Sequence, residues 1–441
     1  MSNTVLTRTV SGSDSTYTYK KNTVSVWLKR SQLGAACFFE GWYSNAFATQ
    51  VYFLSSGELV LNAASSTSGS AFQIVTNRKF RDVNSWYHIV ISIDTTDATS
   101  TDRCKIYVNG VRETSFASAS YPNQNASVQW SGTGNTQFVG RRESGGAGLY
   151  YDGAMSYLAY IDGTAELPTI FGETDTTTGQ WKIKTSITPS VAWGNFGFLI
   201  LKDGNSLTDA SPNSNNFTVG AGTLTDYKDC PSNVLATLNP LWTQESTRVP
   251  TLTLGNNMFS GGSSSTWYQT IGTLGFSSGK YYWEAKYNAG TNLGKNLVGA
   301  VGIDGMTDGK FYEKTPSIFY KNEDGGEYRL NNSQSSGNYG TLAQNDILGC
   351  AIDMDASTPT ATFYKNGTAL VSNISLTGFA GKTIVPAVST YSSGEFQMNF
   401  GNGYFGTTAV SSAGTNASGN GIFEYDTPTG YTALSTKGLN L

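Results

Sequence analysis

Residues 86–94 read Trp-Tyr-His-Ile-Val-Ile-Ser-Ile-Asp, and residues 104–110 read Cys-Lys-Ile-Tyr-Val-Asn-Gly. Both runs are rich in the β-branched and aromatic side chains that suit a strand, and a polar turn separates them. The Asn-Gly pair at 109–110 is typical of a type I′ hairpin turn, in which both central residues take a positive φ. The stretch therefore predicts a strand, a polar turn, a second strand and a tight hairpin.

The same order of features returns in the second half of the chain. Residues 346–355 form a predicted strand that ends in an Asp/Ser/Thr turn, and residues 362–367 read Thr-Phe-Tyr-Lys-Asn-Gly. Similar short runs recur along the chain with almost no helical periodicity between them, which is typical of antiparallel sandwiches. We therefore expect an all-β protein with two antiparallel β-sandwiches of the same kind.

The length of the chain also favours two domains, because single cores stop growing at about 250–300 residues and the chain has 441. Residues 202–265 are rich in Asn, Ser, Thr, Gly and Pro, as exposed connections are. We expect domains at 1–200 and 241–441 joined by a linker at 201–240, with the boundary near Asp226 to Leu241. One helical turn is expected around Pro168 to Phe171.

The composition excludes several classes of protein. Charged residues make up 14% of the chain and the net charge is −4, so nothing attracts nucleic acid in general, and no basic run does so locally. No N-terminal apolar segment and no apolar run of membrane-spanning length occur, so we expect neither a signal peptide nor membrane insertion. The four cysteines, at 37, 104, 230 and 350, lack the C-x-x-C spacing of zinc sites, and Cys104 and Cys350 are expected to be buried free thiols.

Two sets of motifs resemble known families. Residues 85–94, 105–110 and 151–160 (SWYHIVISID, KIYVNG and YDGAMSYLAY) resemble a laminin-G/concanavalin-A-like jelly roll. Residues 278–284, 298–303, 361–367 and 385–389 (SGKYYWE, VGAVGI, ATFYKNG and VPAVS) resemble a SPRY domain. These motifs are structural, so they imply the fold more strongly than the function.

The order of the motifs along nearly the whole chain resembles virion-associated proteins of marine tailed phages. The segments that add to this resemblance lie at 171–181, 233–240 and 427–437 (FGETDTTTGQW, NVLATLNP and TPTGYTALSTK). The resemblance implies a lectin-like protein of the virion surface, made in the host cytoplasm.

Catalysis is not expected. A concanavalin-A-like glycan hydrolase, the enzymatic alternative, needs two carboxylates facing one groove, and strand neighbours that share a face are two residues apart. The nearest pattern is Asp353-Met-Asp355, which closes a strand and is interpreted as two solvated turn carboxylates. His88 is the single histidine, and its place within an aromatic and apolar run predicts a packing role.

Aromatic rings in Gly/Asn/Ser-rich segments are the candidate ligand-binding residues, because a ring offers an apolar face and neighbouring polar groups bond sugar hydroxyls. The candidates are Trp42, Tyr43, Tyr150, Tyr151, Tyr312 and Tyr339. The alternative is that these rings pack against a sheet or a subunit. Candidates for a structural calcium ion, which related sandwiches bind, are Asp94, Asp97 and Asp102, with Asp304 and Asp308 in another turn; no other cofactor is expected.

Two functions remain open at this point. The protein is either a fibre tip or fibre-like appendage that attaches a virion to a host-surface glycan, or a capsid or tail decoration whose main partner is another virion protein. Heptads for a trimeric shaft are missing, so docking through a sandwich surface or a terminus is expected. Many copies on the particle, or a homo-oligomer, are expected in either case, and a secreted bacterial lectin is disfavoured by the missing signal peptide.

Overall fold

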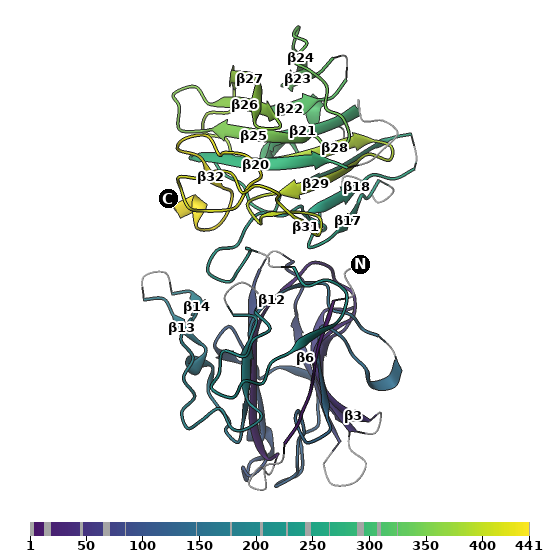
Figure 1. Ribbon diagram of the computed structural model, residues 1–441, viewed down its shortest axis with the longest axis vertical. Coiled ribbons are helices and arrows are strands. Elements are labelled where there is room, and N and C mark those ends of the chain that lie inside the picture. The colour runs from purple at the N-terminus through teal and green to yellow at the C-terminus, as the bar shows by residue number, and fades with distance from the viewer. Residues whose placement is uncertain are drawn as a thin grey trace. The chain divides into compact units, whose positions relative to one another are not determined.

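The computed structural model describes residues 4–12, 19–44, 47–64, 71–83, 85–146, 148–176, 179–202, 206–225, 228–242, 248–263, 265–288, 295–306, 310–323 and 325–440. The chain divides into two compact units, Met1–Asp226 and Tyr227–Leu441 (Figure 1). Each unit is an all-β structure of antiparallel sheets, as the alternating runs predict. Within the described ranges the helices are short 3₁₀ turns, and none has the length and apolar character needed to span a bilayer.

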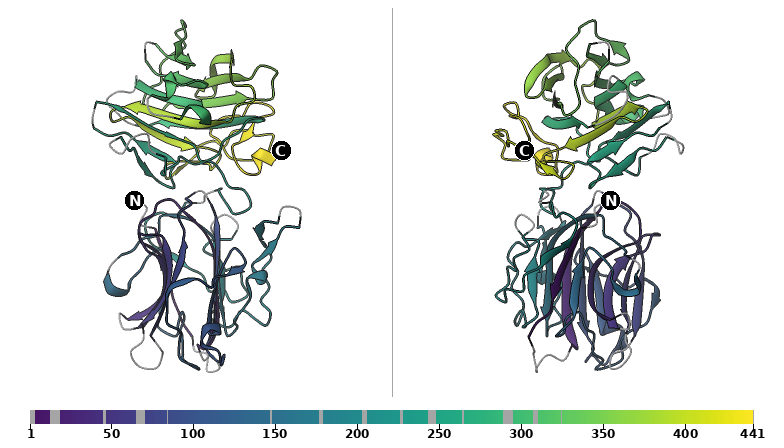
Figure 2. Two further views of the ribbon diagram at one scale, coloured as in Figure 1. Left: turned by 180° about the vertical axis from the view of Figure 1, so that it is seen from behind. Right: turned by 45° about the vertical axis from the view of Figure 1, so that its right-hand side comes forward.

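The first unit consists of two sheets, seen as separate layers in Figure 2. Sheet A has the order β10 (Phe116–Ala119), β6 (Phe72–Lys79), β5 (Glu58–Ala64), β4 (Phe47–Phe53), β3 (Ala36–Ser44), β11 (Thr136–Val139), β1 (Val5–Thr9) and β16 (Thr218–Ala221). Sheet B has the order β15 (Phe198–Ile200), β12 (Gly153–Asp162), β2 (Lys21–Arg30), β7 (Tyr87–Asp94), β8 (Cys104–Val108) and β9 (Val111–Arg112). The hairpin β13 (Gly172–Thr174) and β14 (Trp181–Ile183) and the turns η1 (Ser100–Asp102), η2 (Ser144–Gly146) and η3 (Pro168–Ile170) complete it.

The second unit repeats this plan with a different strand order. Sheet C has the order β17 (Thr251–Thr253), β18 (Met258–Ser260), β29 (Glu395–Asn399), β20 (Lys280–Tyr287), β25 (Ile347–Asp353), β26 (Thr360–Lys365) and β27 (Thr368–Ser375), and β32 (Thr432–Ala433) pairs in parallel with β20. Sheet D has the order β19 (Trp267–Ile271), β28 (Ile384–Tyr391), β21 (Asn296–Gly302), β22 (Ser317–Lys321), β23 (Glu327–Leu330) and β24 (Ser333–Gln334). The remaining elements are β30 (Tyr404–Phe405), β31 (Thr408–Ala409), η5 (Ile303–Gly305), η6 (Phe311–Glu313) and η7 (Gly438–Asn440).

Each unit buries its own hydrophobic core between its two sheets. In the first unit, Val26 and Ile91 of sheet B pack with Phe38 of sheet A. In the second, Trp283 of sheet C packs with Val298 of sheet D. Alternate residues of a strand face opposite sides of a sheet, so each strand places one row of side chains in the core and the other row on the outer face.

Both Asn-Gly hairpins are present as predicted. Asn109 and Gly110 have φ angles of 49° and 80° between β8 and β9, and Asn366 and Gly367 have φ angles of 48° and 79° between β26 and β27. The helical turn expected around Pro168 to Phe171 is η3. The four cysteines are free, and those at 37, 104 and 350 are buried.

The segment 201–240 is not the linker that its polar composition predicted. Within the first unit, β16 pairs with β1 and Phe217 is buried in the core. The Asp209 carboxylate orders this part of the chain, because it accepts hydrogen bonds from the backbone N–H groups of Leu199, Ser211 and Asn215, each at 2.8 Å. Residues 235–238 are buried in the second unit. The error arises because a few apolar residues and one buried carboxylate can fold a segment whose average composition is polar.

Candidate ligand-binding faces

The outer face of sheet A brings together two of the predicted aromatic residues. Gly41 faces the core, since a Cβ atom there would lie 2.3 Å from the carbonyl oxygen of Trp130, so its neighbour Trp42 faces outward. On the adjacent strand, Val139 is in the core and Phe138 faces outward. The ring centroids of Trp42 and Phe138 are 6.4 Å apart and the planes cross at 72°.

Two arginines extend this cluster beyond the strands. The guanidinium carbon of Arg141 lies 5.7 Å from the ring centroid of Phe138 and 5.9 Å from that of Tyr150. The guanidinium carbon of Arg142 lies 5.8 Å from the ring centroid of Tyr52 on β4. We call this surface the arginine–aromatic face; it consists of Trp42, Tyr52, Phe138, Arg141, Arg142 and Tyr150.

A buried carboxylate fixes the segment that carries the arginines. Glu40 on β3 is inaccessible to solvent and accepts hydrogen bonds from the backbone N–H of Glu143 and from both the N–H and the hydroxyl of Ser144. Burial raises the pKa of Glu40. Arg141 also forms an ion pair with Glu143. The cluster therefore balances positive and negative groups and does not form a strongly cationic patch.

Three N–H donors of this face are buried and lack an acceptor within the described residues. They are Nε1 of Trp42, Nε of Arg141 and Nε of Arg142. A buried donor without a partner costs about 1–3 kcal/mol, but these three atoms are inaccessible to solvent and so are not the groups that a ligand would contact. The exposed parts of the rings and the outer N–H groups of the two guanidinium ions are the groups that offer apolar surface and hydrogen bonds.

The other candidates of the first unit lie apart. Tyr43 is 56% exposed and contacts Phe47 at the end of β3. Tyr151, expected to be exposed, is buried and donates its hydroxyl hydrogen to the carbonyl of Lys29 at 2.8 Å. The expectation for Tyr151 is wrong because neighbouring side chains of an extended segment point to opposite sides, so Tyr150 and Tyr151 cannot both face solvent.

In the second unit, Tyr312 and Tyr339 belong to different surroundings. Tyr312 lies in η6 with its ring centroid 5.3 Å from that of Trp267. Tyr339 packs beside Tyr328 at 5.7 Å and against the core of the unit.

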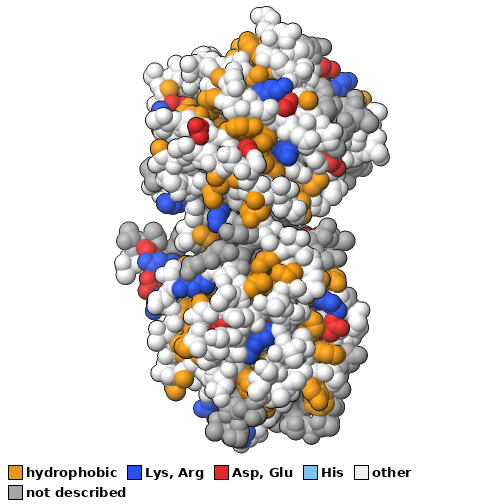
Figure 3. All heavy atoms as spheres, in the orientation of Figure 1, with side chains coloured by type: hydrophobic (Ala, Val, Ile, Leu, Met, Phe, Trp, Pro, Cys, Tyr) orange, Lys and Arg blue, Asp and Glu red, His pale blue; other side chains and the backbone are white. Residues whose placement is uncertain are grey.

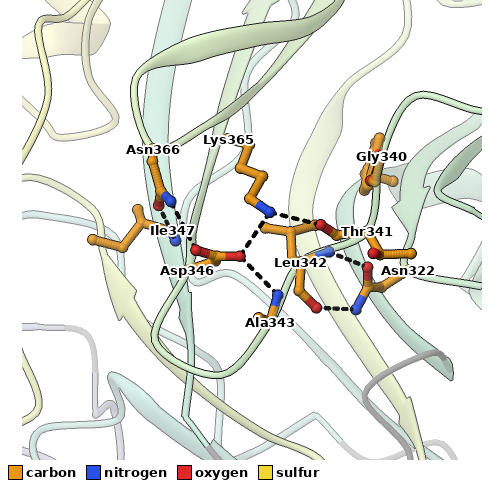
Figure 4. A network of polar contacts seen from close by, with 10 residues as sticks. Asn322, Gly340, Thr341, Leu342, Ala343, Asp346, Ile347, Lys365 and Asn366 are labelled. Carbon is orange, nitrogen blue, oxygen red and sulfur yellow. Dashed lines mark hydrogen bonds and ion pairs between the residues drawn. The ribbon is translucent and has the colours of Figure 1, made fainter.

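A polar network fastens the segment that follows Tyr339 (Figure 4). Lys365 donates to the carbonyl of Thr341 at 2.8 Å and pairs with Asp346 at 2.9 Å. Asn322 donates to the carbonyl of Leu342 at 2.7 Å and accepts the N–H of the same residue. Tyr339 is thus held within an ordered segment.

The carboxylates considered for calcium have separate protein partners. Asp94 pairs with Lys21 at 2.9 Å, Asp97 accepts the N–H of Thr99 at 2.8 Å, and Asp102 pairs with Arg112 at 2.7 Å. Asp304 pairs with Lys382 at 3.2 Å, and Asp308 lies outside the described residues. Among the residues that the structure describes, no group of three His, Cys, Asp or Glu side chains is arranged to hold a metal ion.

His88 is buried in a stack of rings, as its place in the sequence predicts. Its ring centroid lies 4.6 Å from Trp27 and 5.9 Å from Trp181. Trp181 Nε1 donates to His88 Nδ1 at 2.9 Å, so the proton of the neutral ring is on Nε2, which donates to Ser25 Oγ at 2.9 Å. Burial lowers the pKa of His88 to about 3. The ring is therefore neutral at ordinary pH.

The two carboxylates of the Asp353-Met-Asp355 pattern also have partners in the protein. Asp353 pairs with Lys280 at 2.9 Å, and Asp355 accepts the backbone N–H of Gly279 at 2.6 Å. Both lie at the turn after β25, as predicted, but only Asp355 is exposed; Asp353 is buried, so its interpretation as a solvated carboxylate is wrong.

Comparison with protein families assigns both units. The family described as the concanavalin A-like lectin/glucanases superfamily, of laminin G type, matches residues 5–182, and the SPRY domain family matches residues 280–403. The first unit is therefore a laminin-G/concanavalin-A-like domain and the second a SPRY domain, as their motifs suggested. Together these domains indicate a binding or adhesion role.

The chain is also similar to parts of several solved structures, each with a TM-score below 0.5. The chain is similar to the SPRY domain of human HERC1, with 18% identity over 36% of this chain and 96% of that chain and a TM-score of 0.28. The PSpry domain of TRIM65 is 12% identical over 37% and 88% of the two chains, with a TM-score of 0.30. A heptameric SAP-like pentraxin from Limulus polyphemus is 20% identical over 37% and 78%, with a TM-score of 0.24. A search of curated proteins gave no match.

Sequence reasoning missed the residues that connect the predicted rings. Phe138 lies on strand β11 and not in a turn, where the candidate rings were sought. Its alternation with the core residue Val139 would nevertheless have predicted that its side chain faces outward. The pair Arg141-Arg142 gave no distinctive signal either, because adjacent cations also occur at 20–21, 29–30 and 78–79.

Proposed function

We propose that this protein is a non-catalytic component of a tailed-phage virion surface, which attaches the particle to a host-surface glycan through the arginine–aromatic face. The observation that carries the proposal is the convergence of Trp42 and Tyr150, far apart in the sequence, on Phe138 and Arg141. Rings supply the apolar contact for a sugar, and the outer guanidinium N–H groups of Arg141 and Arg142 supply hydrogen bonds to its oxygens.

The charge balance of this face favours a neutral sugar. Arg141 is paired with Glu143, and the Glu40 carboxylate lies beneath the same segment. An anionic ligand would meet the Glu143 carboxylate as well as both arginines. Sugar hydroxyls both donate and accept, so they suit a surface that carries both signs.

The absence of catalysis is part of the proposal. The single histidine is buried and neutral, so it offers no accessible base. Glu40, the carboxyl nearest the face with a raised pKa, is inaccessible to solvent and already accepts hydrogen bonds from Glu143 and Ser144. Incubation of the protein with host polysaccharide should release no reducing ends.

Decoration of the capsid or tail is the second candidate function. The same rings and guanidinium groups favour it, because a neighbouring virion protein would also cover the rings and provide carbonyl acceptors. Antibody labelling of virions distinguishes the two: attachment places the protein at the tail tip or on a fibre, and decoration places it along the head or tail wall.

Adsorption of coated beads to host cells tests the attachment function. A shallow site binds one sugar weakly, whereas many linked sites raise avidity by about 10²–10⁴. Beads coated with the full chain should therefore adsorb to host cells, and free monomer should bind them poorly.

The variant Trp42→Ala/Tyr150→Ala should lose most of this adsorption and keep its melting temperature. Leu167→Ala is the matched control, because Leu167 is 58% exposed and lies outside the face. Equal adsorption of beads coated with an unrelated protein would refute attachment and leave decoration.

A further inference from the structure

The outer face of sheet D carries a second aromatic cluster, in the SPRY domain. Tyr268 is part of the core, so Trp267 faces outward from β19. Tyr391 on β28 is the direct cross-strand partner of Trp267, and their ring centroids are 5.6 Å apart. On the other side of Trp267, the ring of Tyr312 lies 5.3 Å away. Three half-buried rings thus form a row, Tyr312–Trp267–Tyr391.

Cations stand at both ends of this row. The Nζ atom of Lys295 lies 4.6 Å from the ring centroid of Tyr391. At the opposite end, Nζ of Lys310 lies 5.5 Å and Cζ of Arg329 lies 5.7 Å from the ring centroid of Tyr312. These cations lie over the two outer rings. Among the described contacts that involve rings, the central Trp267 contacts the rings of Tyr312 and Tyr391 and no cation.

The row rests on a fixed support. Beneath it lies a cluster of outward-facing apolar residues, which includes Ile271, Leu297 and Phe319. The backbone N–H of Phe311 donates to Gln269 Oε1 at 3.1 Å and so fastens η6, which carries Tyr312, to β19. A ligand would therefore meet rings whose positions the fold has already set, which lowers the entropy lost on binding.

The charge at this surface is positive but small. Lys310 pairs with Glu313 at 2.8 Å and Arg329 pairs with Glu327 at 2.7 Å, while Lys295 has only a ring contact among the interactions described. Nucleic acid binding depends on neutralising many phosphates, and this surface lacks that density of cations. A ligand with separate single charges and apolar surface between them fits better.

We propose that this surface, the Tyr312–Trp267–Tyr391 row with Lys295, Lys310 and Arg329, is a binding site for an acidic polysaccharide of uronic-acid type. A carboxylate of the polysaccharide would meet Lys295, the cation of this surface without an acidic partner among the interactions described. Lys310 and Arg329 would share their charge between Glu313 and Glu327 and the ligand, and the ring faces of the sugars would contact Trp267. The site belongs to the second unit and is independent of the arginine–aromatic face, so the two domains bind saccharides of different charge.

Calorimetric titration of the full chain tests the site, with polygalacturonate oligosaccharide as the acidic probe and dextran oligosaccharide as the neutral one. The acidic probe should bind and the neutral probe should bind at least about tenfold more weakly. Added salt should weaken the acidic interaction, since exposed charges are screened. The variant Lys295→Gln/Lys310→Gln should lose about tenfold in affinity, and Lys295→Arg/Lys310→Arg should retain most of it.

Matched controls keep the result specific. Lys382→Gln/Lys437→Gln removes the same charge from exposed positions outside the row and should bind as the unchanged protein does. The variant Trp42→Ala/Tyr150→Ala should also bind polygalacturonate normally. Binding by the arginine–aromatic face and binding by this site are therefore tested independently of each other. Trp267→Leu should lose binding while its melting temperature verifies folding.

Several outcomes would overturn the proposal. They are absence of binding, equal affinity for dextran, full affinity in the Lys→Gln pair, or loss of binding in the Trp42→Ala/Tyr150→Ala variant. Tighter binding of a single-stranded oligonucleotide than of polygalacturonate would also overturn it, in favour of nucleic acid.

Discussion

The asparagine of each Asn-Gly turn does more than adopt a positive φ. The N–H of Asn109 donates to the carbonyl of His88 at 2.9 Å, and the N–H of His88 donates to Asn109 Oδ1 at 2.8 Å. Asn366 forms the same two bonds with Ile347, at 2.9 and 2.8 Å; the side-chain bond is visible in Figure 4. The repeated motif of the sequence thus corresponds to one repeated hydrogen-bond pattern, which joins the turn to the start of β7 in the first unit and to the start of β25 in the second.

The glycine of the first turn should tolerate no side chain. Gly110 has a φ of 80°, and a Cβ atom there would lie 2.5 Å from the ring of Trp181. Gly163 has a similar φ of 87° but open space around it. Gly163→Ala should therefore lower the free energy of unfolding by about 1 kcal/mol through backbone strain alone. Gly110→Ala should lower it by about 2 kcal/mol or more, because the ring must also move. Urea denaturation of the first unit measures both, and equal losses would show that the contact with Trp181 does not matter.

Glu284 should make the second unit less stable as the pH rises. It is buried on β20, where it accepts hydrogen bonds from the backbone N–H groups of Glu424 and Tyr425, at 2.9 and 3.0 Å, and from Tyr282 and Asn399. Burial raises its pKa from 4.5 to about 7. The folded state therefore holds more protons than the unfolded state between these values. Its contribution to stability is complete below about pH 4.5 and is lost as the pH rises to about 7, a change of about 3 kcal/mol.

The substitution Glu284→Gln should abolish this part of the pH dependence, since an amide does not titrate. Urea unfolding of the full chain between pH 4.5 and 8 measures the slope for the second unit. Glu424→Gln removes the same charge from the segment that Glu284 holds and should retain the slope. A pH profile unchanged in Glu284→Gln would assign the slope to another group.

At the scale of elements, the side chain of Trp181 attaches the hairpin of β13 and β14 to sheet B. Trp181 stacks on His88, which stacks on Trp27 of β2. Gly110 and Gly172 leave the space that the indole ring occupies, because a Cβ atom at either position would lie within 2.6 Å of it. The described residues of the FGETDTTTGQW motif therefore form this hairpin and attach it to sheet B through Trp181.

Replacement of Trp181 should open the hairpin without unfolding the domain. Trp181→Ala removes the stack and the bond to His88 Nδ1, so the amides of β13 and β14 should exchange with solvent at least about tenfold faster while β2 and β7 stay protected. Trp181→Phe keeps a ring but leaves the buried His88 Nδ1 without its donor, which costs about 1–3 kcal/mol; its exchange should be intermediate. Hydrogen exchange measured by mass spectrometry would contradict this if Trp181→Ala left the hairpin protected.

The strands and hairpins could be predicted from the sequence because their signals are local. Alternation and Asn-Gly depend on neighbouring residues, and both describe the structure well. The approach of Arg141 to Phe138 and Tyr150 could not be predicted, because it depends on the Glu40 carboxylate holding a segment about a hundred residues away. The prediction of a linker at 201–240 was wrong for the same reason, because the burial of Leu235 depends on a partner at the far end of the chain.

At the scale of the whole molecule, the SPRY domain is completed by segments outside the family match at 280–403. Leu235 forms a β-bridge with Ser435, and β32 pairs in parallel with β20 (Figure 1). Asn420 bonds to Asn233, Thr432 and Ser435, at 2.9, 2.9 and 3.1 Å. The two motifs NVLATLNP and TPTGYTALSTK are thus adjacent in the fold, and both belong to the second unit.

Exposed charges are sparse on the molecule as well as in its composition. On the side shown in Figure 3, lysine, arginine and acidic side chains stand singly or in small groups among polar ones. With so few charges to repel other molecules, surface contacts depend on rings and hydrogen bonds. This agrees with the ring-centred sites proposed for both domains.

The two units should fold independently if each is expressed with all of its own segments. Every residue of the first core lies at or before Phe217, and every residue of the second core lies at or after Ala236. Fragments 1–226 and 227–441 should therefore each melt cooperatively, and the sum of their unfolding enthalpies should equal that of the full chain.

A fragment limited to 280–403 lacks Leu235, β32 and the backbone N–H donors to Glu284, and should fail to fold although it spans the whole family match. Differential scanning calorimetry of the three fragments and the full chain measures this. Cooperative melting of 280–403, or a fragment 227–441 that does not melt cooperatively, would show that the flanking segments do not complete the SPRY domain.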